Sequence, residues 1–108
     1  MDEKKFKVYC TFKFNWDISA FENIDLKVNP GNSLPREDLL RDIKGCHGLI
    51  CNPRSCKIDA EALDAAGEQL IVISTPSTGY DHIDVEECTR RNILVGYLSH
   101  TFTGKLNF

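Results

Sequence analysis

The sequence predicts an α/β fold, an open parallel sheet of about five strands with helices on both faces. Short strand-like stretches alternate along the chain with segments whose apolar residues recur at helical spacing. The helical segments are about ten residues long, a length that suits the crossover of a βαβ unit. The 108 residues carry a net charge of −3, with 42% hydrophobic and 27% charged residues, as expected for one globular domain.

Five segments have the pattern of a β-strand. The first two contain alternating apolar residues, and the turn-forming run Asn29–Ser33 after the second favours a place near a sheet edge. The third and fourth include the continuous apolar runs that are typical of buried parallel strands. The predicted strands cover residues 6–11, 24–28, 48–51, 70–73 and 93–95.

Three segments carry helix signals at their ends. Pro35 suits a first helical turn, and Asp59 and Asp84 can each cap a helix N-terminus. Gly67 and Asn92 suit the left-handed position that ends a helix. The predicted helices cover residues 34–43, 59–66 and 84–91.

Composition and the N-terminal residues argue against several partners. A nucleic-acid-binding protein needs a basic face, whereas this chain is mildly acidic. No stretch of about 18 apolar residues is present, so the sequence predicts no membrane span. Met1–Lys5 is charged and is followed by no apolar run of signal-peptide length, so we expect a cytoplasmic protein.

The five cysteines lack the pattern of a disulfide framework or a zinc site. Their number is odd, and Cys10 and Cys51 lie inside apolar runs, which favours reduced thiols in the core. Cys46, Cys51 and Cys56, with His47, lack the paired CxxC spacing of zinc ligands. We therefore expect no metal site.

The most informative stretch is Ile73–Asp84, between the fourth predicted strand and the third predicted helix. In open α/β sheets, ligands bind just outside the carboxyl ends of the strands. Gly79 lets a ligand approach the backbone closely, and successive N–H groups in such a turn can bind an anion. A small carboxylate is a suitable guest, and an ordinary polar turn is the alternative. The hydroxyl residues of the stretch are Ser74, Thr75, Ser77 and Thr78.

A second candidate segment, Cys51–Ser55, follows the neighbouring predicted strand, so we expect it beside the first. Its Arg54 can form two hydrogen bonds with a carboxylate, although a solvated arginine is the common alternative. His82 stands between Asp81 and Asp84 but has no accompanying nucleophile. Turn and capping hydrogen bonds are the preferred interpretation of that histidine.

Ile71–Asp84 resembles the D-isomer-specific 2-hydroxyacid dehydrogenase family and, within it, the animal-type glyoxylate and hydroxypyruvate reductases. The resemblance runs from about Lys7 to Thr103 and implies the first part of the family's substrate-binding domain, a flavodoxin-like α/β unit. Supporting stretches in the same order cover residues 45–51, 63–67 and 91–97.

The resemblance implies that two loops bind a small 2-oxo or 2-hydroxy acid. The loop matching Thr78 and Gly79 offers backbone N–H groups to the carboxylate and the keto oxygen. The loop matching Asn52 and Arg54 lies across the same cleft and departs here from the closest relatives, which leaves the substrate preference open. The implied substrate-binding residues are Asn52, Pro53, Arg54, Ser77, Thr78 and Gly79.

The implied reaction is hydride transfer from NAD or NADP to the 2-oxo acid. The family's nucleotide-binding domain and its catalytic Arg, Glu and His lie outside residues 1–108, and no GxGxxG motif occurs within them. His82 and His100 do not match the catalytic histidine. We therefore expect this chain alone to bind no cofactor, to contain no catalytic residue and to have no turnover.

Two other interpretations stay open. Some relatives are corepressors that bind short peptides on this domain, so a truncated isoform could be a non-catalytic module that binds a peptide or a full-length subunit. The chain could equally come from an incomplete gene model. The sequence decides neither between NAD and NADP nor whether the protein is a homo-oligomer.

Overall fold

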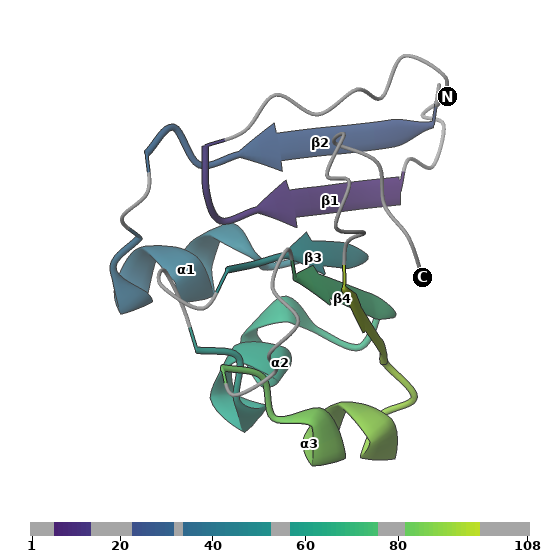
Figure 1. Cartoon of the computed structure of the whole chain (residues 1–108). Helices are drawn as coiled ribbons and strands as arrows, with labels where there is room; N and C mark the ends of the chain where they lie inside the picture. Colours follow the sequence, from purple (N-terminus) through teal and green to yellow (C-terminus); the bar gives the residue numbers. More distant parts are fainter. Residues whose placement is uncertain (1–5, 14–22, 32–33, 53–56, 76–81, 98–108) are drawn as a thin grey trace.

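The computed structural model describes residues 6–13, 23–31, 34–52, 57–75 and 82–97, which form one parallel sheet and three helices. The sheet has five strands in the order β2-β1-β3-β4-β5 (Figure 1), the open parallel arrangement that the sequence predicts, with β2 at one edge. The strands are β1 (Phe6–Cys10), β2 (Ile24–Val28), β3 (Gly48–Ile50), β4 (Val72–Thr75) and β5 (Leu94–Tyr97). The helices are α1 (Arg36–Asp42), α2 (Ala60–Ala66) and α3 (Val85–Arg90).

The three helices lie on one face of this sheet. Each joins two strands, and the steps from β2 to β3, β3 to β4 and β4 to β5 all move across the sheet in the same direction. Right-handed crossovers in one direction place their helices on the same face. Leu39, Leu63 and Cys88, one from each helix, accordingly share a buried cluster with Leu49 and Ile73 of the sheet.

A second, smaller cluster lies on the opposite face. Val8 and Cys10 of β1 pack there with Ile50 and Phe12, and the alternating apolar residues of β2 flank them. No residue of the three described helices belongs to this cluster. The helices that the sequence predicts on this second face are therefore not among the described residues. None of the described helices is both long and apolar enough for a transmembrane span.

Local signals place the ends of α2 and α3 within one residue of the predicted positions, whereas α1 begins two residues after its predicted start, with Pro35 at the position before the helix. The Asp59 carboxylate accepts a hydrogen bond from the Ala62 N–H at 3.1 Å, and Asp84 accepts one from Glu87 N–H at 3.1 Å. Gly67 and Asn92 have positive φ angles of 105° and 62° just after α2 and α3, where the sequence predicts them. Gly67, with a ψ of 175°, is extended rather than left-handed helical, a conformation open to glycine because it has no Cβ. The N-terminus of each of α2 and α3 is therefore fixed by its own cap.

The fourth strand differs from the prediction by two residues. Pairing with β3 begins at Val72, opposite Gly48, and continues through Ser74, opposite Ile50. The bounds of a strand are set by its pairing with the neighbouring strand rather than by the hydrophobicity of its residues. Ile71 is apolar, yet it lies before β4 and its side chain is exposed. The strand instead includes Ser74 and Thr75, which the sequence indicates as part of the following loop.

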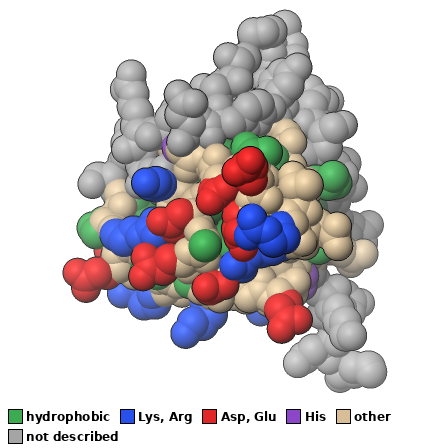
Figure 2. All heavy atoms as spheres, turned by 90° about the horizontal axis from the view of Figure 1, so that it is seen from below, with side chains coloured by type: hydrophobic (Ala, Val, Ile, Leu, Met, Phe, Trp, Pro, Cys, Tyr) green, Lys and Arg blue, Asp and Glu red, His purple; other side chains and the backbone are tan. Residues whose placement is uncertain are grey.

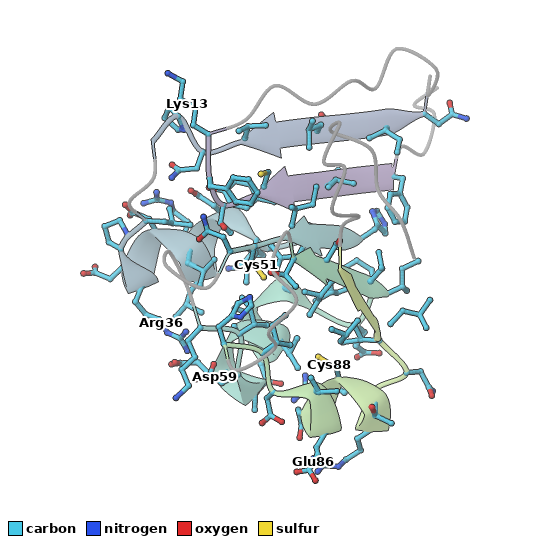
Figure 3. All side chains as sticks on the ribbon, in the orientation of Figure 1. Lys13, Arg36, Cys51, Asp59, Glu86 and Cys88 are labelled. Atoms are coloured by element: carbon cyan, nitrogen blue, oxygen red, sulfur yellow. The ribbon has the colours of Figure 1, made fainter. Side chains whose placement is uncertain are left out.

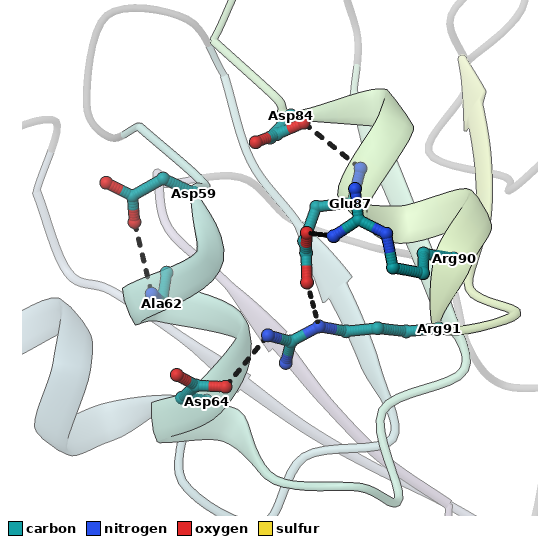
Figure 4. A network of polar contacts seen from close by, with 7 residues as sticks. All are labelled: Asp59, Ala62, Asp64, Asp84, Glu87, Arg90 and Arg91. Atoms are coloured by element: carbon teal, nitrogen blue, oxygen red, sulfur yellow. Dashed lines mark hydrogen bonds and ion pairs between the residues drawn. The ribbon is translucent and has the colours of Figure 1, made fainter.

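Charged side chains cover the helical side of the molecule and join α2 to α3. Arg91 contacts Asp64 of α2 at 2.9 Å and Glu87 of α3 at 2.8 Å, and Arg90 also pairs with Glu87 (Figure 4). Seen from below, acidic and basic groups are interspersed on this side (Figure 2). This face has the character of a solvated surface that holds two helices together.

Candidate functional site

The two candidate segments begin side by side at the carboxyl edge of the sheet. β3 and β4 are hydrogen-bonded neighbours, and the Cys51 N–H extends their pairing by donating to the Ser74 carbonyl at 2.9 Å. The chain therefore leaves β3 at Asn52 next to the point where it leaves β4 after Thr75. Because both strands are parallel, the sequence prediction that these segments are neighbours is confirmed at their starts.

The two segments also end side by side. Ile58 and Ile83 form an isolated parallel bridge, in which the Ile58 N–H donates to the His82 carbonyl at 2.7 Å. The Asp84 N–H donates back to the Ile58 carbonyl at 2.9 Å. Each segment thus runs from one of two adjacent strands to one of two adjacent bridge residues.

Of the predicted substrate-binding residues, Asn52 is described and half-buried at the start of its segment. The others lie outside the described residues, so their roles stay predictions. They are Pro53, Arg54, Ser77, Thr78 and Gly79.

Three small side chains, Thr11, Cys51 and Thr75, form a row at the carboxyl ends of three adjacent strands. Each follows or ends one of the adjacent strands β1, β3 and β4, on the face that carries the helices, and each has 0% exposure. Main-chain bonds hold the row in register, since the Thr11 N–H donates to the Ile50 carbonyl at 2.9 Å. The row is therefore a packed floor, and the Thr75 hydroxyl does not line an open cleft.

The floor lies at the point where the strand order changes direction. From β1 the chain first goes to β2 on one side and then crosses to β3 on the other side, so the direction reverses between β1 and β3. Open α/β sheets bind their ligands at such a switch point. Asn29 secures the β1 and β2 ends by donating to the carbonyls of Thr11 at 3.2 Å and Gly31 at 3.1 Å. Sequence reasoning found the strands but not this asparagine link.

Arg36 also lies at this edge (Figure 3). Its guanidinium donates to the Lys57 carbonyl at 2.7 Å, to Asp59 at 2.6 Å and to Glu61 at 2.8 Å. Sequence reasoning missed this group of contacts, which we call the Arg36 clamp. One signal was available: a cation at the first position of a helix opposes the helix dipole, so nearby carboxylates are expected to compensate it.

The clamp changes the acidity of its own members. Hydrogen bonding to Arg36 lowers the pKa of Asp59, and hydrogen bonds to Glu61 and then Asp59 raise the pKa of Arg36. Because the carboxyl pKa is lower in the folded chain, the resulting stabilisation is complete above the ordinary pKa of Asp59. It is lost as the pH falls through the lowered, folded-state pKa.

The two described histidines, His47 and His82, make contacts that belong to the fold. His82 is buried, and its carbonyl accepts the bridge hydrogen bond from Ile58, in keeping with a local structural role. Asp81 lies outside the described residues. The His47 Nδ1 accepts a hydrogen bond from the Lys7 N–H at 3.0 Å, and its ring stacks on Phe6 with centroids 5.3 Å apart.

Cys10, Cys46, Cys51 and Cys88 are buried free thiols, as the sequence predicts. Burial raises the pKa of Cys46 to about 12 and that of Cys88 to about 11. Across the described ranges, no three metal-ligating side chains are grouped closely enough to hold a metal ion.

The described residues do not fit a nicotinamide dinucleotide. Such a cofactor needs a glycine-rich turn between a strand and a helix N-terminus. β1 is followed instead by Thr11, Phe12 and Lys13, and β3 by Cys51 and Asn52. No cofactor site is assigned to these residues.

Comparison with known proteins identifies the family of this chain. The sequence model of the family described as D-isomer specific 2-hydroxyacid dehydrogenase, catalytic domain, matches residues 14–103. Glyoxylate reductase/hydroxypyruvate reductase of Mus musculus is 44% identical over 82 residues, covering 73% of this chain and 25% of that protein. Glyoxylate reductase of Thermofilum pendens is 46% identical over 82 residues, covering 74% and 23%. This chain thus spans about a quarter of the length of these curated relatives.

Solved structures agree with this assignment. The TT0316 protein from Thermus thermophilus has a TM-score of 0.75 and 33% identity, covering 82% of this chain and 29% of that chain. The PH0520 protein from Pyrococcus horikoshii has a TM-score of 0.71 and 33% identity, covering 90% and 28%. Together with the family match over most of its length, these similarities show that the chain belongs to the D-isomer specific 2-hydroxyacid dehydrogenase family.

Proposed function

We propose that this chain is the substrate-binding portion of an NAD(P)-dependent glyoxylate/hydroxypyruvate reductase. The observation that carries the proposal concerns the described residues that flank segments 53–56 and 76–81. The two segments follow the adjacent strands β3 and β4, and the bridge between Ile58 and Ile83 lies just after them. The relatives named as glyoxylate reductases support the substrate class, a small 2-oxo acid.

The chemistry of the two segments suits such a substrate. Backbone N–H groups at Thr78 and Gly79, with Ser77 beside them, would donate to the carboxylate and keto oxygens. Arg54 and Asn52 on the other segment would add a cation and an amide. This chain's part in the reaction is therefore to bind and orient the acid.

We further propose that the 108-residue chain has no turnover by itself. When bound, NAD(P)H supplies the hydride, and the described residues offer it no site. Orientation of a substrate can lower a barrier by several kcal/mol but cannot replace a hydride donor. We expect no NADPH or NADH oxidation with glyoxylate above the enzyme-free rate, measured by nicotinamide absorbance. Oxidation that scales with the concentration of the purified chain would contradict this.

Binding of the acid is tested by titrating ¹⁵N-labelled chain with oxalate, an unreactive dicarboxylate. We expect amide shifts at residues 52–54 and 77–79, with a dissociation constant above about 1 mM, because half a cleft provides less than about 4 kcal/mol. Arg54→Met should weaken binding about tenfold, since it removes charge-assisted hydrogen bonds.

The matched control is Arg90→Met, which removes an exposed guanidinium from α3 that pairs with Glu87. This control should bind oxalate with the same affinity as the parent chain. Chloride at equal ionic strength should leave the amide chemical shifts of both segments unchanged. Shifts confined to other regions, or equal affinity in the two variants, would speak against the proposed site.

Association with a full-length subunit, a peptide or a second copy of the chain stays a prediction, as does the cytoplasmic location. The described residues of this single chain do not test them. The choice between NAD and NADP likewise stays open.

A further inference from the structure

The outer edge of β5 offers backbone groups with which no described strand pairs. β5 is the last strand of the sheet, and among the described strands only β4 is paired with it. The Leu94 N–H donates to the Ile71 carbonyl at 2.9 Å, so the backbone groups of Leu94 and Gly96 face β4. Backbone groups alternate in direction along a strand, and those of Val95 and Tyr97 therefore point to the outer edge.

The two edges of the sheet differ in charge. At the opposite edge, β2 carries Asp25 and Lys27. Charged side chains are one of the devices by which an edge strand avoids pairing with another chain. β5 has the sequence Leu-Val-Gly-Tyr, without a charged residue or a proline. Of the two edges, the one at β5 is therefore open to the addition of a strand.

Exposed apolar side chains gather beside this edge. The large hydrophobic residues that are exposed in the described part of the chain are Ile71, Val85 and Leu94. Val85 begins α3, which packs against β5, and Ile71 is bonded to Leu94 through the main chain. Leu94 is 67% exposed although it lies in a strand. Exposed apolar residues that adjoin one another are typical of a surface that contacts another protein.

We propose that β5 binds β5 of a second copy of the chain, antiparallel to it, about a twofold axis at Gly96. In this register Val95 lies opposite Tyr97 of the second copy, and the two residues exchange two main-chain hydrogen bonds. The axis repeats this pair, so the outward groups of both residues are satisfied in each copy. Gly96 then faces Gly96 at the closely spaced position of an antiparallel ladder, where the lack of side chains lets the strands approach.

The charges of α3 favour a second copy as the partner. A twofold axis through the paired strands places the two α3 helices antiparallel on the same side of the combined sheet. α3 has Glu86 and Glu87 in its first turn and Arg90 in its last turn. Glu86 and Arg90 are exposed, and Glu86 has no ion pair within the described ranges. The acidic start of each α3 therefore lies beside the basic end of the other, which makes the two surfaces complementary.

Val95→Pro tests this pairing because it removes an outward N–H and no hydrogen bond to β4. Proline is tolerated in an edge strand where the N–H faces outward. Leu26→Pro is the matched control at the other edge. Leu26 is half-buried like Val95, and its N–H points outward from β2, since the Asn29 N–H three positions later faces β1 and donates to the Cys10 carbonyl.

Sedimentation equilibrium of the parent chain should show monomers that form dimers as the concentration rises. We expect Leu26→Pro to dimerise like the parent. Val95→Pro should raise the dimer dissociation constant about tenfold or more, because the dimer loses one hydrogen bond per copy. Leu94→Lys should also weaken the dimer, and it alters only an exposed side chain, so it decides the matter if a proline variant does not fold. Circular dichroism shows whether each variant is folded.

Hydrogen exchange followed by NMR distinguishes pairing at β5 from other association. The Val95 amide should exchange more slowly as the concentration of the chain rises, whereas the Leu26 amide should not. A parent chain that stays monomeric at every concentration would overturn the proposal, as would Val95→Pro and Leu94→Lys dimers as stable as those of the parent. Slow exchange of the Val95 amide at all concentrations would mean that the edge is covered within one chain, which also contradicts the proposal.

Discussion

Ile73→Ala is expected to lower the free energy of unfolding by about 2–5 kcal/mol. Ile73 is 0% exposed in β4, opposite Leu49 of β3 and Val95 of β5, in the cluster that receives all three helices. Removing three of its side-chain carbons there leaves a cavity that sheet and helices cannot fill without moving. Since small domains are stable by about 5–15 kcal/mol, this one change takes a large share of the total.

The chain supplies the control two residues earlier. Ile71 is 51% exposed and precedes β4, so Ile71→Ala should cost no more than about 0.5 kcal/mol. Urea unfolding followed by circular dichroism gives both values under the same conditions. Equal losses in the two variants would mean that Ile71 is packed as deeply as Ile73, which would contradict the observed exposure of Ile71.

This pair of isoleucines also shows what hydrophobicity alone leaves open. Leu70–Ile73 is an apolar run from which the sequence predicts a strand, and the strand exists, but Ser74 and Thr75 complete it. Hydrogen bonding to Gly48–Ile50 decides where it starts. A run of apolar residues marks a buried region, and only the partner strand fixes its bounds.

Helix ends were predictable because their determinants are local. Asp59 and Asp84 accept hydrogen bonds from residues three positions further on, and the left-handed φ of Asn92 is a property of that residue. Such interactions can be recognised from the spacing of a few residues, without knowledge of the rest of the fold.

The site was predictable only in part, for the opposite reason. Arg36 and Asp59 are 23 residues apart, and Asn29 reaches the Thr11 carbonyl across 18 positions. These contacts exist because the sheet order brings the carboxyl ends of several strands together, which no local spacing encodes. The sequence pointed to the segments after β3 and β4, and the fold places the ends of these two strands, where the segments begin, next to each other.

The largest effect of burial is expected on the chemistry of two cysteines. The pKa of Cys46 rises from 9.0 to about 12 and that of Cys88 from 9.0 to about 11, in both cases chiefly by burial. The thiolate, not the thiol, is the nucleophile. At pH 8 the thiolate fraction therefore falls about a thousandfold for Cys46 and about a hundredfold for Cys88, since each pKa unit is a factor of ten.

Iodoacetamide labelling at pH 8, followed by peptide mass spectrometry, measures this protection. We expect Cys46 and Cys88 to react at least about a hundredfold more slowly in the native chain than in the urea-denatured chain. Labelling of Cys46 at its denatured rate would mean that the thiol is accessible and ionised.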